Sequence, residues 1–285
     1  MATTISIINN KGGVGKTTST GIIGELMAYL GKRVLCIDLD QQSNLSMMLG
    51  CYTEDPEPVI NGVEAPEKEN ITELFKGRYR TKEEVLPLIQ HTQINGLDII
   101  PSSKRHKNTQ LNIEINKTGN NNIILKKALS TIKDDYDFIL IDNAPASDIL
   151  TVNSMFASDY VLTPVRVESF SYKGLKETLD SIAYIKEEHD LENANFLGAF
   201  ITQAEINTNV YKDLRDNYEA ELGTRFLKTP IRKDIKIAEI ETLFEPILAY
   251  NADTNAVFDY GKLLLELNIL DKKATKKLKE SIGEE

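Results

Sequence analysis

The feature that most constrains this chain is a glycine-rich loop at residues 10–18, which reads Asn-Lys-Gly-Gly-Val-Gly-Lys-Thr-Thr. It lies between an apolar run, residues 5–8, and a segment with helical spacing of apolar residues, 16–30. In a strand–loop–helix unit of this kind, the N–H groups of the loop and the positive end of the helix converge on anionic oxygens. Lys16 can reach terminal phosphates, and the Thr17 hydroxyl can bind a magnesium ion. The loop therefore predicts a site for nucleotide phosphates.

This loop differs from the common phosphate-loop pattern G-x-x-x-x-G-K-[ST] in two ways. Asn10 stands where that pattern has glycine, and a second lysine, Lys11, precedes the glycines. Two lysines five residues apart around three glycines form a much rarer signal than a glycine-rich turn alone. The alternative is a surface turn with solvated lysines.

Apolar runs that alternate with helical segments predict an α/β fold with a mostly parallel, twisted sheet and helices on both faces. The length of 285 residues suits a single phosphate-loop domain, which we place at residues 1–270. Residues 52–120 are a variable, insertion-like region within it, and residues 271–285 are a charged tail. The expected strands are 3–9, 33–40, 96–101, 136–142, 160–165, 196–202 and a short one at 225–227.

Three acidic side chains fall at the carboxyl ends of expected strands, where open parallel sheets bind ligands. Asp142 follows four apolar residues and could hold magnesium together with Thr17. Of Asp38 and Asp40, one could support the metal shell while the other orients an attacking water. The alternatives are a strand-end turn for Asp142, a helix cap for Asp38 and simple solvation for Asp40.

The overall charge and the apolar pattern limit the class of protein. The net charge of −10 argues against a surface that attracts nucleic acid everywhere, although a local basic patch is compatible with it. No run of eighteen apolar residues is present, and the N-terminus shows no secretion signal, so we expect a cytoplasmic protein. Cys36 and Cys51 have no metal-ligand spacing, and Cys36 is expected in the core.

Several motifs together resemble the ParA/MinD family of deviant-Walker ATPases and, within it, the ParA-type DNA-partition ATPases. Residues 11–18 match the family's KGGVGKTT throughout. Further similarities cover residues 38–46 (DLDPQGNLT), 136–145 (YDxIIIDxPP), 157–165 (ASDxVLxPV), 170–175 (FSxxGL), 197–209 (GVLxTMYDxRTN) and 235–239 (VRLxEA). The chain departs from the pattern at Gln41, at Ala144 and at residues 203–205.

The resemblance implies an ATPase that binds ATP with Mg²⁺ and forms a nucleotide sandwich dimer with a second copy of itself. Lys11 would reach the partner's phosphates, Lys16 would bind phosphates in its own subunit, and Asp40 would act on the hydrolytic water. Thr17, Asp38 and Asp142 would form the metal site. The implied nucleotide contacts are Lys11, Gly12, Gly13, Val14, Gly15, Lys16, Thr17, Thr18 and Gln203. A ParB-like, centromere-binding adaptor would stimulate slow hydrolysis, and the ATP dimer would bind double-stranded DNA nonspecifically on the nucleoid.

A basic cluster near the C-terminus is the expected DNA-binding surface. Its members fall within twelve residues that contain one acid, Asp234, and they could neutralise DNA phosphates. They are Arg225, Lys228, Arg232, Lys233 and Lys236. The alternative is a solvated helix entrance, which is the more usual role of a charge run.

The chief rival function is a MinD-like, membrane-associated positioning ATPase. It would need a C-terminal amphipathic helix with a broad apolar face. The tail offers only Ala274, Leu278 and Ile282 on one stripe, with no aromatic residue, so we expect no membrane partner. A metabolic or metal-handling enzyme on the same fold is a third possibility, which the positions of the two cysteines do not favour. We also expect no specific operator binding, because no helix-turn-helix-sized segment precedes residue 3.

Overall fold

The fold is built around one central β-sheet. In the computed structural model, which describes residues 1–52, 70–76, 79–103, 121–167, 171–243, 245–250 and 253–284, seven strands form one sheet in the order β3-β4-β2-β5-β1-β6-β7. All neighbouring strands are parallel except β3, which pairs antiparallel with β4. The strands are β1 (Thr3–Ile7), β2 (Val34–Asp38), β3 (Gln90–His91), β4 (Leu97–Ile100), β5 (Phe138–Asp142), β6 (Tyr160–Arg166) and β7 (Asn195–Thr202). The predicted α/β fold with a mostly parallel sheet is confirmed.

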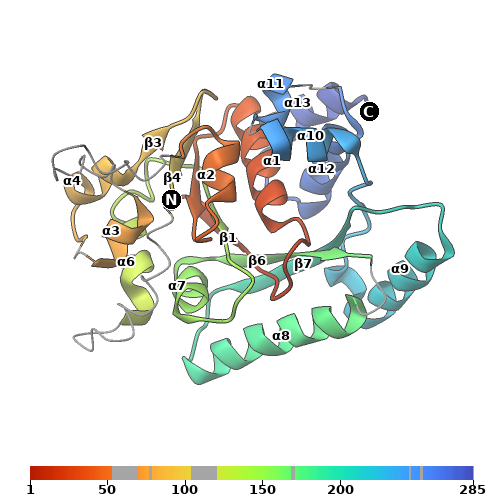
Figure 1. The fold of residues 1–285 in the computed structure, drawn as a ribbon, viewed down its shortest axis with the longest axis horizontal. Coiled ribbons are helices and arrows are strands. Elements are labelled where there is room, and N and C mark those ends of the chain that lie inside the picture. Colours follow the sequence, from red (N-terminus) through yellow and green to blue (C-terminus); the bar gives the residue numbers. More distant parts are fainter. Residues whose placement is uncertain are drawn as a thin grey trace, which may run out of the picture.

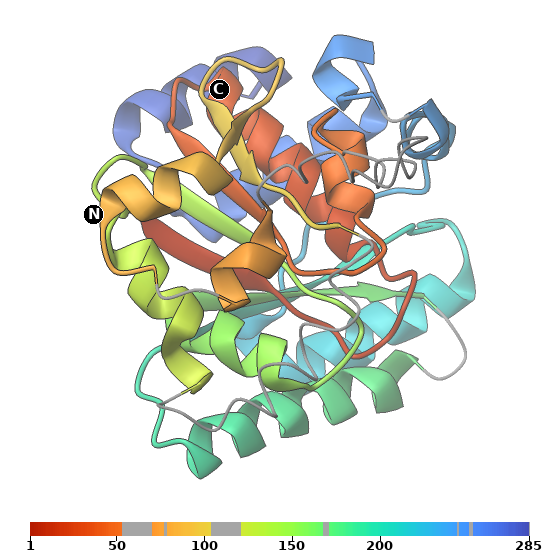
Figure 2. The same cartoon turned by 60° about the vertical axis from the view of Figure 1, so that its left-hand side comes forward.

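Helices cover both faces of this sheet (Figures 1 and 2). One face carries α1 (Lys16–Tyr29), α12 (Asn255–Leu267) and α13 (Lys272–Ile282), with α2 (Asn44–Met48), α10 (Ile235–Leu243) and α11 (Ile247–Tyr250) beside them. The other face carries α6 (Ile124–Ser130), α7 (Ile149–Ala157), α8 (Ser171–Glu188) and α9 (Asn209–Leu222). The shorter elements are α3 (Ile71–Lys76), α4 (Lys82–Val85), η1 (Leu86–Leu88), η3 (Asn121–Ile123) and η4 (Gly223–Arg225).

Side chains that alternate along the strands fill the two layers of core. Val34 and Cys36 of β2 point into the cluster under α1, whereas Leu35 and Ile37 point into the cluster on the opposite face. A strand that is buried on both faces must be apolar at every position, which explains the continuous apolar runs in the sequence. The parallel pairing of these strands places the carboxyl ends of β1, β2 and β5 side by side at one edge of the sheet.

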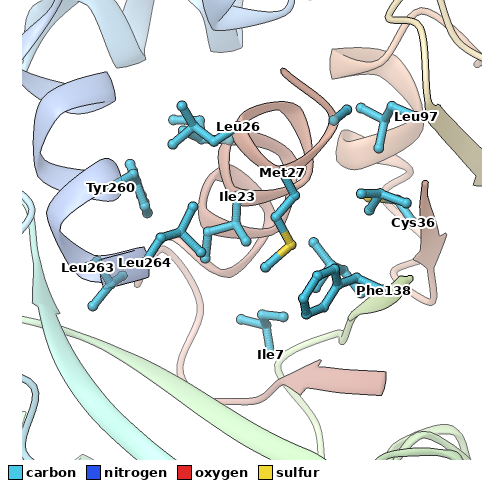
Figure 3. Close-up of a cluster of buried hydrophobic side chains, with 14 of the residues drawn as sticks. Ile7, Ile23, Leu26, Met27, Cys36, Leu97, Phe138, Tyr260, Leu263 and Leu264 are labelled. Carbon is cyan, nitrogen blue, oxygen red and sulfur yellow. The ribbon is translucent and has the colours of Figure 1, made fainter. Parts of the chain in front are cut away.

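Helix α1 packs closely on the sheet because it carries a glycine at the contact. A Cβ atom at Gly24 would lie 3.1 Å from the Cys36 sulfur and 3.3 Å from Leu97. Figure 3 shows Cys36 and Leu97 beside α1, with Tyr260 on its other side. The expectation that Cys36 is a core residue is confirmed, and burial raises the pKa of its thiol.

The charged tail is largely helical and belongs to the packed molecule. Helix α13 begins after Asp271, whose side chain accepts a hydrogen bond from the Ala274 N–H at 2.9 Å. Ala274 and Leu278 are buried, and a Cβ atom at Gly261 of α12 would lie 3.4 Å from Leu278. The apolar stripe of the tail is therefore used for packing on α12. Within the described residues, none of the helices combines the length and apolar composition needed to cross a bilayer.

Two other details differ from the sequence predictions. The strand expected at 225–227 is wrong, because Arg225 ends the 3-10 turn η4 and only Phe226 bridges to Ala199 of β7. The helices α2 and α7 and the short elements β3 and α11 were not predicted. Much of the insertion-like region, residues 53–69 and 104–120, lies outside the described residues.

Candidate nucleotide-binding site

The glycine-rich loop connects β1 to α1, and two of its glycines have backbone conformations that side chains disfavour. Gly13 has φ +70° and Gly15 has φ +83°, both in the left-handed region. Helix α1 begins directly after Gly15, so its N-terminal N–H groups face the loop. Thr202, at the end of β7, anchors the loop by donating a hydrogen bond to the carbonyl of Val14 at 2.9 Å.

Lys16 lies inside the loop. Its Nζ donates a hydrogen bond to the Lys11 carbonyl at 2.9 Å, and the residue is only 6% exposed. Burial lowers the pKa of Lys16, and the nearby carboxylates of Asp142 and Asp40 oppose that effect. A lysine side chain that lies inside the loop beside two carboxyl groups is well suited to bind phosphate oxygens.

Thr17 and Asp142 come together at the end of the sheet. The Thr17 hydroxyl donates to Asp142 Oδ2 at 2.7 Å, although 125 residues separate them in the sequence. Asp142 is fully buried, and its other oxygen, Oδ1, has no hydrogen-bond partner among the described residues. Burial raises the pKa of this carboxyl well above its usual range, with a further contribution from Asp38. A hydroxyl beside a buried carboxylate with an unused oxygen is the hard-oxygen donor set that Mg²⁺ prefers.

Asp38 and Asp40 have different surroundings. The oxygens of Asp38 accept hydrogen bonds from the backbone and hydroxyl of Ser46 (2.9 and 2.7 Å) and from the Asp40 N–H (3.0 Å). Asp38 thereby joins the end of β2 to the following loop and to helix α2, as the helix-cap alternative predicted. Burial raises the pKa of Asp38 to about 7. Asp38 also lies opposite Asp142 in the strand register. Its role in the metal site stays a prediction.

The loop and the strand ends enclose a cavity of about 320 Å³. Asp40, Gln203 and the glycine loop line it, which brings residues predicted from three separate motifs to one space. Asn44, Met48 and Pro145 also line the cavity and were not predicted to do so. They follow strand ends in the sequence, and that position was the available signal.

Four of the five predicted DNA-binding residues are paired with acids. Lys228 pairs with Glu219 (2.6 Å), and Lys233 pairs with Glu205 (2.9 Å). Arg232 binds Asp259 at 2.7 Å, and Lys236 binds Glu239 at 2.8 Å. No ion pair of Arg225 is found within the described residues. The cluster is therefore far less positive than its local charge count indicated, because Glu205, Glu219 and Asp259 fold onto it and Glu239 pairs with Lys236.

The sequence reasoning also missed how the start of the loop is held. Asn10 donates to the Ser181 hydroxyl of α8 at 2.9 Å and accepts a hydrogen bond from Ser147, also at 2.9 Å. The sequence identifies Asn10 only as a departure from the common loop pattern. These contacts show that asparagine at this position joins the loop to α8.

Comparison with known proteins places this site among related chains. Residues 2–196, about two thirds of the chain, match the AAA domain family. The chain is similar to the chromosome-partitioning ATPase Soj of Treponema pallidum, with 30% identity over 94% of this chain and 97% of that protein. It is also similar to the sporulation initiation inhibitor protein Soj of Bacillus subtilis, with 29% identity over 94% and 98% of the two chains.

Solved structures show the same fold. Apo McdA from Cyanothece covers 94% of this chain and 100% of its own, with a TM-score of 0.78 and 19% identity. A Borrelia burgdorferi plasmid partition protein bound to AMPPNP has a TM-score of 0.73 and 25% identity, with 94% of this chain and 99% of that chain covered. The likeness therefore extends over nearly the whole of each chain.

Proposed function

Since the chain belongs to the AAA domain family and, within it, to the ParA-type partition ATPases, we propose that it uses ATP hydrolysis to move or position plasmid or chromosomal DNA. The observation that carries the catalytic part is the Thr17–Asp142 pair at the mouth of the glycine loop, with the unused buried oxygen of Asp142. The cofactors of the protein are ATP and Mg²⁺. The related B. burgdorferi structure is bound to AMPPNP.

Different residues of this chain are assigned to phosphate binding, metal binding and orientation of the attacking water. The N–H groups of Gly12 to Thr18 and the ammonium of Lys16 bind the phosphates, while Thr17 and Asp142 would hold Mg²⁺. Bound Mg²⁺ supplies charge neutralisation on the phosphate oxygens. Asp40 lines the same cavity and is more exposed than Asp38, which supports our assignment of Asp40 to the attacking water.

A dimer would complete the site. Lys11 begins the loop, and the resemblance assigns it to the phosphates of a second subunit. We propose an ATP-dependent homodimer in which each Lys11 crosses the interface. A ParB-like adaptor would stimulate hydrolysis on the dimer, and release from DNA after hydrolysis would renew the cycle.

DNA binding by the ATP dimer, with nucleoid association as its result, is supported by exposed positive charge in two places. The first is the predicted cluster from Arg225 to Lys236, in which Arg225, Lys228 and Lys233 are exposed although both lysines pair with acids. The second is the outward face of α13, where Lys272, Lys273, Lys276 and Lys277 are all exposed. Binding through such side chains neutralises phosphates without reading sequence.

The ATPase assignment of Asp40 is tested by turnover and nucleotide binding measured together. We expect Asp40→Ala to lower ATP turnover by roughly 100-fold while a fluorescent ATP analogue still binds with Mg²⁺. Both proteins are measured alone, with duplex DNA and with the co-encoded adaptor. Unchanged turnover in Asp40→Ala would remove Asp40 from the mechanism.

The DNA surface is tested with three charge-reversal pairs in a nonspecific duplex-binding assay with ATP. Lys233→Glu with Lys236→Glu changes the predicted cluster, and Lys272→Glu with Lys273→Glu changes α13. Lys126→Glu with Lys127→Glu, two exposed lysines on α6, is the matched control. A pair that binds phosphates should weaken binding when reversed and reduce the slope of log affinity against log salt by about 0.9 for each phosphate that is no longer neutralised. Wild-type binding by all three variants would show that DNA binds neither surface.

A further inference from the structure

The first residues of the glycine loop are attached to one face of α8. Asn9 Oδ1 accepts hydrogen bonds from the Lys11 N–H at 2.9 Å and from the Thr178 hydroxyl at 3.2 Å. Asn10 contacts the same helix twice, through Thr178 at 3.3 Å and Ser181 at 2.9 Å. The start of the loop and α8 therefore form one connected unit.

Gly174 lies one helical turn before Thr178, on the same face of α8. A Cβ atom at this position would lie 2.6 Å from Lys11 Nζ and 2.8 Å from Lys11 Cδ, closer than side-chain atoms approach one another. Only glycine leaves room for the Lys11 side chain where it lies in this structure. Glycine is otherwise disfavoured in the interior of a helix, so its presence here needs a reason such as this contact.

We propose that Gly174 is a positioning residue that forms a notch on α8, which holds the Lys11 side chain in its own subunit until a second nucleotide-bound subunit takes it. This inference rests on the proposed ATP-dependent dimer. Lys11 cannot occupy the notch and reach a partner's phosphates at once, so the notch competes with dimer formation. A dimer needs both of its lysines, and the fraction of subunits with Lys11 released therefore enters the dimer dissociation constant twice.

The competition makes a specific prediction for Gly174→Ala. The three atoms nearest to the added methyl group all belong to the flexible Lys11 side chain, so we expect Lys11 to move and the helix backbone to stay in place. Alanine also favours the helical conformation, and the variant should fold. We expect Lys11 to become more accessible in the nucleotide-free protein. We also expect the dimer dissociation constant with AMPPNP and Mg²⁺ to fall by roughly threefold or more.

Two measurements test this on the full chain. The first is the rate at which Lys11 is acetylated by an N-hydroxysuccinimide ester without nucleotide, followed by mass spectrometry, with buried Lys16 as an internal reference. The second is sedimentation velocity over a range of protein concentrations with AMPPNP and Mg²⁺. Lys176→Ala is the matched control, because it places alanine on an exposed position of the same helix.

The proposal predicts faster Lys11 acetylation and tighter dimerisation in Gly174→Ala, with neither change in Lys176→Ala. Acetylation of Lys11 at the wild-type rate would overturn the notch. Faster acetylation together with unchanged or weaker dimerisation would overturn the competition. A wild-type protein that stays monomeric with AMPPNP would instead refute the proposed dimer, whereas the acetylation rates would still decide whether the notch exists.

Discussion

Glu25 is a buried carboxyl that the nucleotide chemistry does not use. It lies on α1 and accepts hydrogen bonds from the backbone N–H groups of Ile247 (3.2 Å) and Leu248 (3.0 Å), where α11 begins. Burial raises its pKa from 4.5 to about 7, and the two backbone hydrogen bonds only partly oppose this. Glu25 therefore joins α11 to α1, and it is neutral over a pH range in which an exposed glutamate is charged.

The raised pKa of Glu25 makes the folded protein less stable as the pH rises. Below pH 4.5 the carboxyl is protonated in both states, and between 4.5 and 7 the folded state holds a proton that the unfolded state releases. Glu25 should therefore lower the unfolding free energy by about 3 kcal/mol as the pH rises from 4.5 to 7. Asp38 and Asp142 have raised pKa values too and act in the same direction.

Urea unfolding at several pH values between 4.5 and 8, without nucleotide, measures this dependence. In Glu25→Gln the titrating group is removed, so the decline in stability should become shallower. An equally steep decline in Glu25→Gln would assign the effect entirely to other groups.

At the level of single residues, motif spacing predicted the loop well and predicted the acids only in part. Lys16, Thr17 and Asp142 lie together as expected, because the ends of neighbouring parallel strands must meet. The hydrogen bonds of Asp38 to Ser46 depend on how the loop after β2 turns, and strand periodicity holds no information about that. The pairing of Arg232 with Asp259 also needs contacts across 27 residues that a local charge count omits.

Among the helices, α13 differs most from its prediction. The sequence identifies it only as part of a charged tail, and it has five lysines in eleven residues. The capping residue Asp271, the left-handed Gly283 and the apolar spacing of Ala274, Leu278 and Ile282 were all present as helix signals. What the sequence could not supply was the apolar surface of α12 beside Gly261, on which this stripe packs.

Because α13 packs on α12, substitutions on its buried face should lower the stability of the fold much more than substitutions on its exposed face. Leu278→Ala should lower the unfolding free energy by about 2–4 kcal/mol, because it leaves a cavity beside α12. Lys272→Glu with Lys273→Glu should change it by no more than about 0.5 kcal/mol, because both side chains are exposed. Urea unfolding of the three proteins gives these values. Equal stabilities would mean that α13 does not pack on α12 in solution.

The same helix also bears on the membrane alternative. Liposome co-sedimentation with ATP should leave the protein in the supernatant, because the apolar stripe of α13 is occupied by α12. Vesicles rich in anionic lipid and neutral vesicles are compared, since the exposed lysines alone could attract an anionic surface. Sedimentation with neutral vesicles would revive the MinD-like function.

Across the whole molecule, the nucleotide site is assembled from distant parts of the sequence. The glycine loop follows β1, Asp40 follows β2, Asp142 ends β5 and Gln203 follows β7. The sequence predicted this convergence because a parallel sheet brings its strand ends to one edge. Strand order and the antiparallel edge strand β3 could not be predicted, since the apolar strands are too similar in sequence to determine which of them pair.

A site built in this way should link nucleotide binding to global stability. ATP with Mg²⁺ at 100 times its dissociation constant should raise the unfolding free energy by about 2.7 kcal/mol. In Asp142→Asn, the thermal shift with ATP should be smaller than in the wild-type protein, and it should be the same with and without Mg²⁺. The reason is that the amide is a poorer metal ligand than the carboxylate. Thermal melts with ATP, in the presence of Mg²⁺ or EDTA, measure both. A full magnesium-dependent shift in Asp142→Asn would show that other residues hold the ion.

The position of β1 in the sheet has a consequence for how the protein is made. β1 pairs with β5 and β6, and its register partners include Phe138 for Thr3 and Tyr160 for Ile5. At a synthesis rate of about 5–20 residues per second, roughly 7 to 30 s pass before the first partner of β1 is available. Throughout that interval the ribosome carries an apolar strand without its neighbours. The segment made first is thus among the last to be enclosed, and a chain arrested before residue 138 lacks both the partners of β1 and Asp142.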